Sequence, residues 1–168
     1  MKTIELTRGQ VAIVDDEDYE WLNQWKWFAQ YTPHTRTYYA ARNTPKGKGK
    51  QTVLIMARVI CGLKRGNKRE VDHKNHKSLD NRKVNLRICS HQENSCNQFA
   101  HRFHNGKPCT SQYQGVSWHK QTKKWRTRIR IHGKSIWLGL FTSEIAAAQR
   151  YNQAAQKLFG KFACPNKI

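Results

Sequence analysis

A strict alternation of side chains near the C-terminus limits the fold of this chain more than any other feature. In residues 124–131 (KWRTRIRI), apolar or β-branched side chains occupy every second position and cations lie between them. Because successive side chains of a strand point to opposite faces, we predict a strand here. One face then holds Trp125, Thr127, Ile129 and Ile131. The other face carries an arginine row, Arg126, Arg128 and Arg130.

Further strands and one helix are predicted around this strand. Residues 113–118 and 135–141 resemble strands, and residues 132–134 a turn. Thr142 suits a helix N-cap and Gly160 suits the C-terminal stop, with Glu144 in the first turn. Apolar side chains recur near helical spacing between these ends: Ile145, Ala148, Tyr151, Ala155, Leu158 and Phe159. We therefore expect three antiparallel strands packed on one helix, with the arginine row on the open face.

Residues 71–97 gather side chains suited to metal-assisted attack on a phosphodiester. Asp72 precedes His73, and Asn85 and Asn94 follow downstream. Asn94 would lie in a short helix, because Ser90-x-x-Glu93 fits a capping box. Asp72 and Asn94 offer oxygen ligands to a hard divalent cation that would act as a Lewis acid. An imidazole such as His73 can take a proton from water near neutral pH.

Three other interpretations of this segment stay open. Asn97 could replace Asn94 as ligand, because residues three apart share a helix face. Asp80 and Asn81 are interpreted as turn formers. A structural zinc site is disfavoured, because the chain has no C-x-x-C pair. Its ligands would be His73, His76, Cys89 and Cys96.

The segment resembles the active-site core of the HNH (His-Asn-His) endonucleases, most closely the intron-homing and phage branch. The resemblance implies a strand-strand-helix metal fold with His73 as general base, oriented by Asn85. It also implies that Asp72 and Asn94 are the metal ligands. Residues 79–82 (LDNR) and 85–87 (NLR) are typical of that branch. At residues 56–58 the chain has Met-Ala-Arg, where such proteins often carry Met-His-Arg.

The C-terminal segment resembles the plant Apetala-two (ethylene-response-factor) DNA-binding domain. The likeness rests on residues 113–116 (YQGV), 137–141 (WLGLF) and the alanine-rich helix of residues 147–155. It implies a sheet in the DNA major groove, a route open to β-ribbons generally. Arg126 is a further candidate DNA contact, which the alternation of residues 124–131 adds to those that the resemblance implies. The family usually has arginine at 114, 117 and 119, so we expect a different target sequence. The contacts implied by position are Gln114, Ser117, His119, Lys124, Arg128, Arg130 and Trp137.

The N-terminal part is predicted to be an α+β unit. Residues 10–14, 26–31 and 37–42 resemble strands, and 15–25 a helix. Residues 53–60 could be a strand or a buried helix, with Thr52 as a possible N-cap. For residues 46–50 (KGKGK), phosphate contact and a solvated turn are equal alternatives. Trp21, Trp25, Trp27 and Phe28 are the expected core aromatics.

Composition agrees with a nucleic-acid partner. The chain has 31 Lys+Arg against 11 Asp+Glu, a formal net charge of +20. Such a field attracts polyanions with salt-dependent affinity. The five cysteines lack the spacing typical of disulfide-bonded secreted domains, so we expect reduced thiols. The sequence shows neither a signal peptide nor an apolar run long enough to span a bilayer. We therefore expect an intracellular, cytoplasmic protein of a bacterial or phage-infected cell.

Together these features predict a DNA endonuclease of the homing or mobile-element type. It would comprise an HNH domain (1–97), a linker (98–112) and an Apetala-two-like domain (113–164). We expect Mg²⁺ as cofactor, for which Mn²⁺ can substitute, and double-stranded DNA as partner, without a membrane or an obligate protein partner. The alternative is a non-catalytic DNA-binding regulator with a decayed nuclease fold. An RNA binder is less favoured, because deep A-form grooves exclude a sheet.

Overall fold

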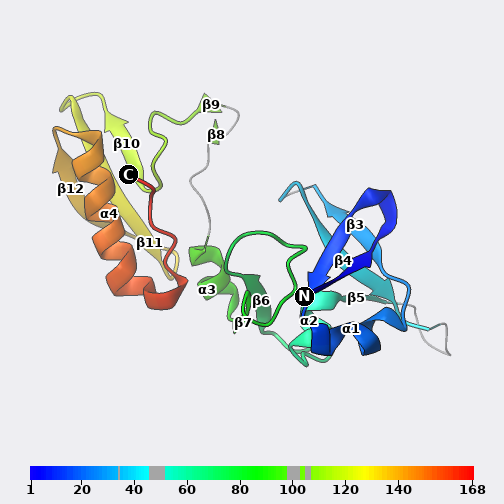
Figure 1. The fold of residues 1–168 in the computed structure, drawn as a ribbon. Coiled ribbons are helices and arrows are strands. Elements are labelled where there is room, and N and C mark those ends of the chain that lie inside the picture. Colours follow the sequence, from blue (N-terminus) through cyan, green and yellow to red (C-terminus); the bar gives the residue numbers. More distant parts are fainter. Residues whose placement is uncertain (34, 46–51, 98–102, 105–106) are drawn as a thin grey trace. The chain divides into compact units, whose positions relative to one another are not determined.

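The computed structural model describes residues 1–33, 35–45, 52–97, 103–104 and 107–168, so the KGKGK segment lies outside the described residues. The chain forms two compact units, Met1–His91 and Gln92–Ile168 (Figure 1). The second unit thus begins before the predicted linker at 98–112. Among the described residues, no helix is both long and apolar enough to cross a membrane.

The first unit opens with a short antiparallel pair and a helix. β1 (Lys2–Glu5) pairs with β2 (Val11–Val14) across the 3₁₀ turn η1 (Thr7–Gly9). Helix α1 (Asp16–Asn23) carries three acids in its first turn, where the helix dipole favours negative charge. The predicted strand at 10–14 and the helix within 15–25 are confirmed. β1 was not predicted.

A three-stranded antiparallel sheet follows, in the order β3-β4-β5. β3 (Phe28–Thr32) and β4 (Thr37–Asn43) confirm the strands predicted at 26–31 and 37–42, and they pair as an antiparallel hairpin. The ambiguous run at 53–60 divides into β5 (Val53–Ile55) and α2 (Met56–Ile60). The N-cap prediction for Thr52 was wrong, because pairing with β4 keeps the chain extended as far as Ile55, which precedes α2.

Two of the four predicted core aromatics pack against the core of the first unit. Trp27 is buried and donates from Nε1 to the Leu22 carbonyl at 2.8 Å, and Trp21 is partly buried. Phe28 is only half-buried. The prediction was wrong for Trp25, which lies beyond α1 and is 42% exposed. Its ring stacks instead on the guanidinium of Arg42, at 4.1 Å.

The predicted site segment contains two strands and a helix in sequence. β6 (Glu70–His73) pairs antiparallel with β7 (Leu86–Cys89), and α3 (His91–Cys96) begins directly after Ser90. The chain between the strands attaches to β2, because Ile13 exchanges main-chain hydrogen bonds with Leu79 and Asn81. All but the first residue of α3 belongs to the second unit.

The second unit contains the predicted sheet on a helix. β10 (Val116–His119), β11 (Lys124–Ile131) and β12 (Lys134–Phe141) are antiparallel in that order. α4 (Glu144–Phe159) packs on the sheet and is followed by the 3₁₀ turn η2 (Gly160–Phe162) (Figure 1). Gly160 ends α4, as predicted. Within the predicted linker, β8 (Phe103–His104) pairs with β9 (Lys107–Pro108).

Details of α4 differ from the prediction. The N-cap is Ser143 and not Thr142, because the Ser143 hydroxyl accepts from the Ala146 amide. Ile145 and Leu158 are 49% and 38% exposed, so they do not cover the sheet. The small side chains let α4 approach the strands closely. The buried residues of α4 are Ala147, Ala148, Tyr151, Ala154 and Ala155.

Candidate functional site

Asp72 and His73 lie next to each other at the end of β6, and both are buried. Asp72 is opposite Arg87 of β7 in the strand register. The Arg87 guanidinium approaches one oxygen of that carboxylate twice, with Nε at 2.7 Å and Nη2 at 2.5 Å from Oδ2. This ion pair fixes the orientation of the Asp72 carboxylate, because an arginine fork restricts the geometry of its partner.

The imidazole of His73 is held by Asn81. His73 Nε2 lies 3.3 Å from Asn81 Oδ1, and the Tyr39 ring centre lies 6.3 Å from that of His73. Burial lowers the pKa of His73 below its ordinary value, because a charged ring loses hydration there. The ring is therefore neutral near pH 7. An amide oxygen only accepts, so Nε2 carries the proton and the lone pair lies on Nδ1.

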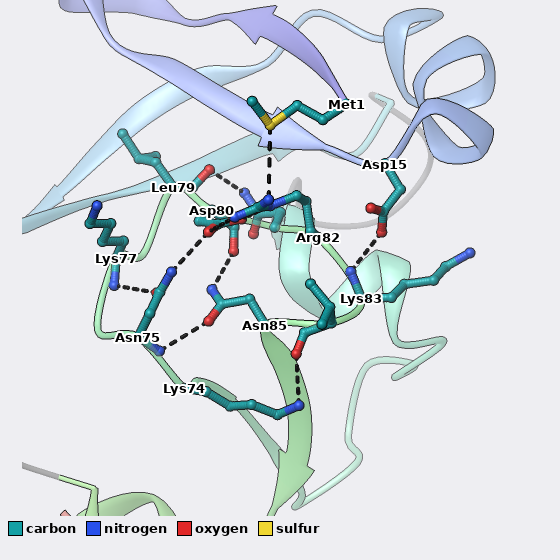
Figure 2. Close-up of polar contacts among 12 residues, drawn as sticks. Met1, Asp15, Lys74, Asn75, Lys77, Leu79, Asp80, Arg82, Lys83 and Asn85 are labelled. Carbon is teal, nitrogen blue, oxygen red and sulfur yellow. Dashed lines mark hydrogen bonds and ion pairs between the residues drawn. The ribbon is translucent and has the colours of Figure 1, made fainter.

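The chain between β6 and β7 is held by a network centred on Asp80 (Figure 2). Asp80 Oδ1 accepts from Arg82 Nε at 2.7 Å, and its Oδ2 accepts from Arg82 Nη2 and from Asn75 Nδ2. The Asn85 side chain donates to the Asp80 carbonyl at 2.7 Å and accepts from the Asn75 amide at 3.0 Å. These bonds stabilise the loop that places Asn81 against His73.

The sequence did not predict that Asn81 contacts His73 while Asn85 bonds to the main chain of the loop. The interpretation of Asp80 and Asn81 as turn formers was incomplete, because both side chains are buried and bonded to partners beyond the turn. Asn85, predicted to orient His73, bonds the loop through both of its polar atoms. The LDNR and NLR patterns drew attention to the right residues. Only the folded loop shows which amide contacts the imidazole.

Asn94 lies on α3 in the second unit, so its role as a ligand stays a prediction. His73, His76 and Cys89 do not gather ligand atoms as a zinc site requires. Among the described residues, the one such cluster of three is Asp15, Glu17 and Asp18. Lys83 already pairs with the last two of these.

The open face of the second sheet carries the arginine row. Thr127 and Ile129 are buried, whereas Arg128 and Arg130 are exposed and Arg126 is half-buried, so the predicted alternation is confirmed. Arg126 Nε donates to Ser117 Oγ of the neighbouring strand at 3.2 Å. The Arg128 guanidinium lies 5.5 Å from the Trp137 ring centre. Cation–π contact holds this charge on the face of the sheet.

A β-bulge places Trp137 beside the arginines. Thr127 pairs with Gly139 and Arg128 with Trp137, so Leu138 of β12 is the extra residue between them. A bulge reverses the alternation of the strand that contains it. Without it, Trp137 would lie opposite Ile129, on the face that packs against α4. The bulge therefore exposes Trp137, which is 51% exposed, and turns Leu138 towards the core.

The other predicted DNA contacts lie on or beside this sheet. Ser117 and His119 are on β10, and Lys124 begins β11 as an exposed residue. His119 Nδ1 lies 2.9 Å from Thr122 Oγ1. Gln114 precedes β10. Its main chain is fixed by the Asn166 side chain, which accepts from Gln114 N at 2.6 Å and donates to its carbonyl at 3.2 Å.

The comparisons with known proteins agree with both resemblances. Residues 111–161 match the AP2 domain model. Across 161 residues, the chain is 29% identical to an uncharacterized HNH endonuclease of Acanthamoeba polyphaga mimivirus, covering 96% of this chain and 77% of that protein. Over 51 residues it is 41% identical to an AP2-like ethylene-responsive transcription factor of Arabidopsis thaliana.

The same share of the chain is 41% identical to APETALA2-like protein 2 of Oryza sativa subsp. indica. These plant matches cover 30% of this chain but only 10% and 12% of the relatives, so the likeness is to one domain. No solved structure matches the chain significantly. The two likenesses expected from the sequence, to HNH endonucleases and to AP2 domains, are thereby confirmed.

Proposed function

We propose that this protein is a divalent-metal-dependent DNA endonuclease whose second unit brings it to its target site. The observation that carries the proposal is the buried Asp72–His73 pair, with a neutral imidazole held by Asn81. A neutral histidine can accept the proton of an attacking water. The basic chain and its likeness to an HNH endonuclease support DNA as the substrate.

The donor atoms on this chain fit a hard divalent cation such as Mg²⁺. Asp72 offers carboxylate oxygens and Asn94 an amide oxygen, the ligand type that such cations prefer. The cation would supply Lewis-acid stabilisation of the leaving oxygen. Arg87 orients Asp72, and the Asp80 network keeps Asn81 against the base. We propose Asp72, His73, Asn85 and Asn94 as one strand-strand-helix site, in which Asn85 holds the loop.

The sheet of the second unit is the proposed DNA-binding surface. Its contacts are the predicted set, with Arg126, Arg128 and Arg130 between Trp137 on β12 and Ser117 and His119 on β10. Guanidinium groups can bind both phosphates and guanine edges. The likeness to AP2 proteins supports a major-groove contact. Because the usual arginines are replaced at 114, 117 and 119, the target sequence should differ from theirs.

Replacing the base tests the proposal. His73→Ala should reduce cleavage of plasmid DNA in Mg²⁺ by about 10²- to 10⁴-fold, because a general base contributes that much. DNA affinity should stay nearly unchanged, since the imidazole acts on water. His76→Gly is the matched control: it removes a nearby imidazole, and glycine suits the positive φ of 61° at that position.

Cleavage by His73→Ala within a few-fold of the wild type would contradict the assignment. A zinc site would instead make His76→Gly equally damaging, and chelation would then unfold the protein. Tightly held stoichiometric zinc would overturn the Mg²⁺ proposal. If Mg²⁺ supports no cleavage of any DNA, the chain is a DNA-binding protein without nuclease activity.

A further inference from the structure

A strongly basic loop joins α2 to β6 in the first unit. Residues 64–69 (KRGNKR), called here the 64–69 loop, are all exposed. Four of the six are cations: Lys64, Arg65, Lys68 and Arg69. The loop runs directly into β6, so Arg69 lies only three residues before Asp72. This basic, exposed loop is therefore attached to the strand that carries the proposed site.

The main chain of the 64–69 loop is held in place by Arg58 of α2. Arg58 Nη1 donates to the Arg69 carbonyl at 2.6 Å, and Nη2 donates to the Asn67 carbonyl at 3.1 Å. Within the loop, the Arg69 amide donates to Asn67 Oδ1 at 2.9 Å, and the Asn67 amide to the Lys64 carbonyl. An arginine fork makes such a contact with two nitrogens held in one plane, a geometry that the single ammonium nitrogen of lysine does not reproduce.

Three cations of the loop, Lys64, Arg65 and Lys68, are not neutralised by the acids of the first unit. Among the described residues, no ion pair or side-chain hydrogen bond involves Lys64, Arg65 or Lys68. The acids of α1 pair elsewhere, with the N-terminal amine, Lys2 and Lys83. Glu70, which follows the loop, lies 2.8 Å from His91. The charges of Lys64, Arg65 and Lys68 therefore face solvent.

We propose that the 64–69 loop binds the phosphate backbone of duplex DNA beside the proposed cleavage site. Ordering a mobile loop on binding costs about 1–2 kcal/mol per residue in conformational entropy. A loop that is already held in place avoids part of this cost. Arg58 is a positioning residue, because its guanidinium donates to the loop carbonyls of Asn67 and Arg69. The contact is independent of DNA sequence, since phosphates carry no base information. The proposal rests on the proposed endonuclease function for its placement beside the cut.

The test is the salt dependence of DNA binding by the full chain. Lys64→Gln, Arg65→Gln and Lys68→Gln together remove three exposed charges. If each neutralises one phosphate, the slope of log affinity against log salt should fall by about two to three, equally on target and scrambled duplexes. The matched control is Arg150→Gln, Lys157→Gln and Lys161→Gln, which removes three exposed charges from the α4 side of the second unit. That control should leave the slope nearly unchanged.

A positioning variant separates charge from loop geometry. Arg58→Lys keeps the charge but loses the two separate nitrogens that hold the Asn67 and Arg69 carbonyls, so affinity should fall several-fold while the salt slope stays constant. Asn67→Ala, which removes the bond to the Arg69 amide, should act in the same direction. Thermal melting of each variant checks that the first unit remains folded. A merely solvated loop predicts no loss of affinity in any of these variants.

The binding measurement does not depend on cutting. If the wild type never cleaves DNA but the Lys64, Arg65 and Lys68 variant has a lower salt slope of DNA binding, the proposed phosphate contact is supported and the proposed endonuclease activity is contradicted. Normal cleavage with an unchanged slope in the Lys64, Arg65 and Lys68 variant would overturn the loop proposal alone. Loss of affinity for hairpin RNA, with duplex DNA binding intact, would also overturn it.

Discussion

Gly115 lies where the start of β10, β11 and α4 meet. Its φ of +75° belongs to the left-handed region, which favours glycine. A Cβ atom at this position would overlap the Tyr151 ring and the Arg128 carbonyl oxygen. The residue therefore brings the edge strand against the helix, beside the arginine row.

Gly115→Ala should lower the free energy of unfolding of the second unit by about 2–5 kcal/mol. Overpacking contributes about 1–3 kcal/mol and left-handed strain about 1–2 kcal/mol. Gly133→Ala is the control, because its φ is +74° but no heavy atom lies within 4 Å of the added Cβ. Only the strain should remain there. Urea denaturation of both variants measures the difference, and equal losses would contradict the role of close packing.

At the scale of elements, the loop between β6 and β7 depends on one buried carboxylate. Asp80 is buried and accepts from Arg82 and Asn75, and the Arg82 guanidinium holds the pKa of that carboxyl below its usual range. The loop in turn places Asn81 against His73. The stability of this element and the orientation of the base are thus coupled.

Asp80→Ala should destabilise the first unit by about 2–3 kcal/mol, since hydrogen bonds to a buried charged group are lost. The pKa of Asp80 is lower in the folded state. Its contribution is therefore complete above the unfolded value of about 3.9 and is lost as the pH falls through the folded value. Urea denaturation between pH 3 and pH 7 measures this. If wild type and variant showed the same pH dependence, the Arg82–Asp80 pair would not contribute.

At the scale of the whole molecule, the proposed nuclease and DNA-binding parts share α3. This helix carries Asn94, yet Gln92, Glu93 and Cys96 line one cavity together with Ile131 of β11, Phe159 of α4 and Phe162 of η2. Removing residues 113–168 would strip α3 of these partners. Substitution on the open face of the sheet is therefore the cleaner way to separate DNA binding from cleavage.

Arg128→Ala should weaken binding to a duplex selected from a random pool by about 1–3 kcal/mol if its guanidinium contacts a base edge. If it contacts only phosphate, target and scrambled duplexes should lose affinity alike and the salt slope should fall by about one. Arg150→Ala on α4 is the control. Cleavage at saturating DNA should stay unchanged, and an equal fall there would place Arg128 in the catalytic site instead.

The sequence by itself determined the elements whose periodicity has one physical solution. Residues 124–131 form a strand with its arginines exposed, because period-two alternation buries one face only in a strand. The hairpin of β3 and β4, the helix α4 and its end at Gly160 were predictable for similar local reasons. At the proposed site, the spacing with Asn85 and Asn94 singled out Asp72 and His73, which the structure shows as adjacent buried residues.

Tertiary structure decided what local patterns cannot specify. Asn81 contacts His73 because the 74–85 loop folds back onto Ile13 of β2, a contact between segments distant in sequence. Trp25, between α1 and β3, stacks on Arg42 of β4 and stays 42% exposed, although its tryptophan-rich segment indicated a core residue. Trp137 lies beside the arginines because of the bulge at Leu138, which the register with β11 defines. In each case the partner is chosen by long-range packing, which residue types and spacing alone do not determine.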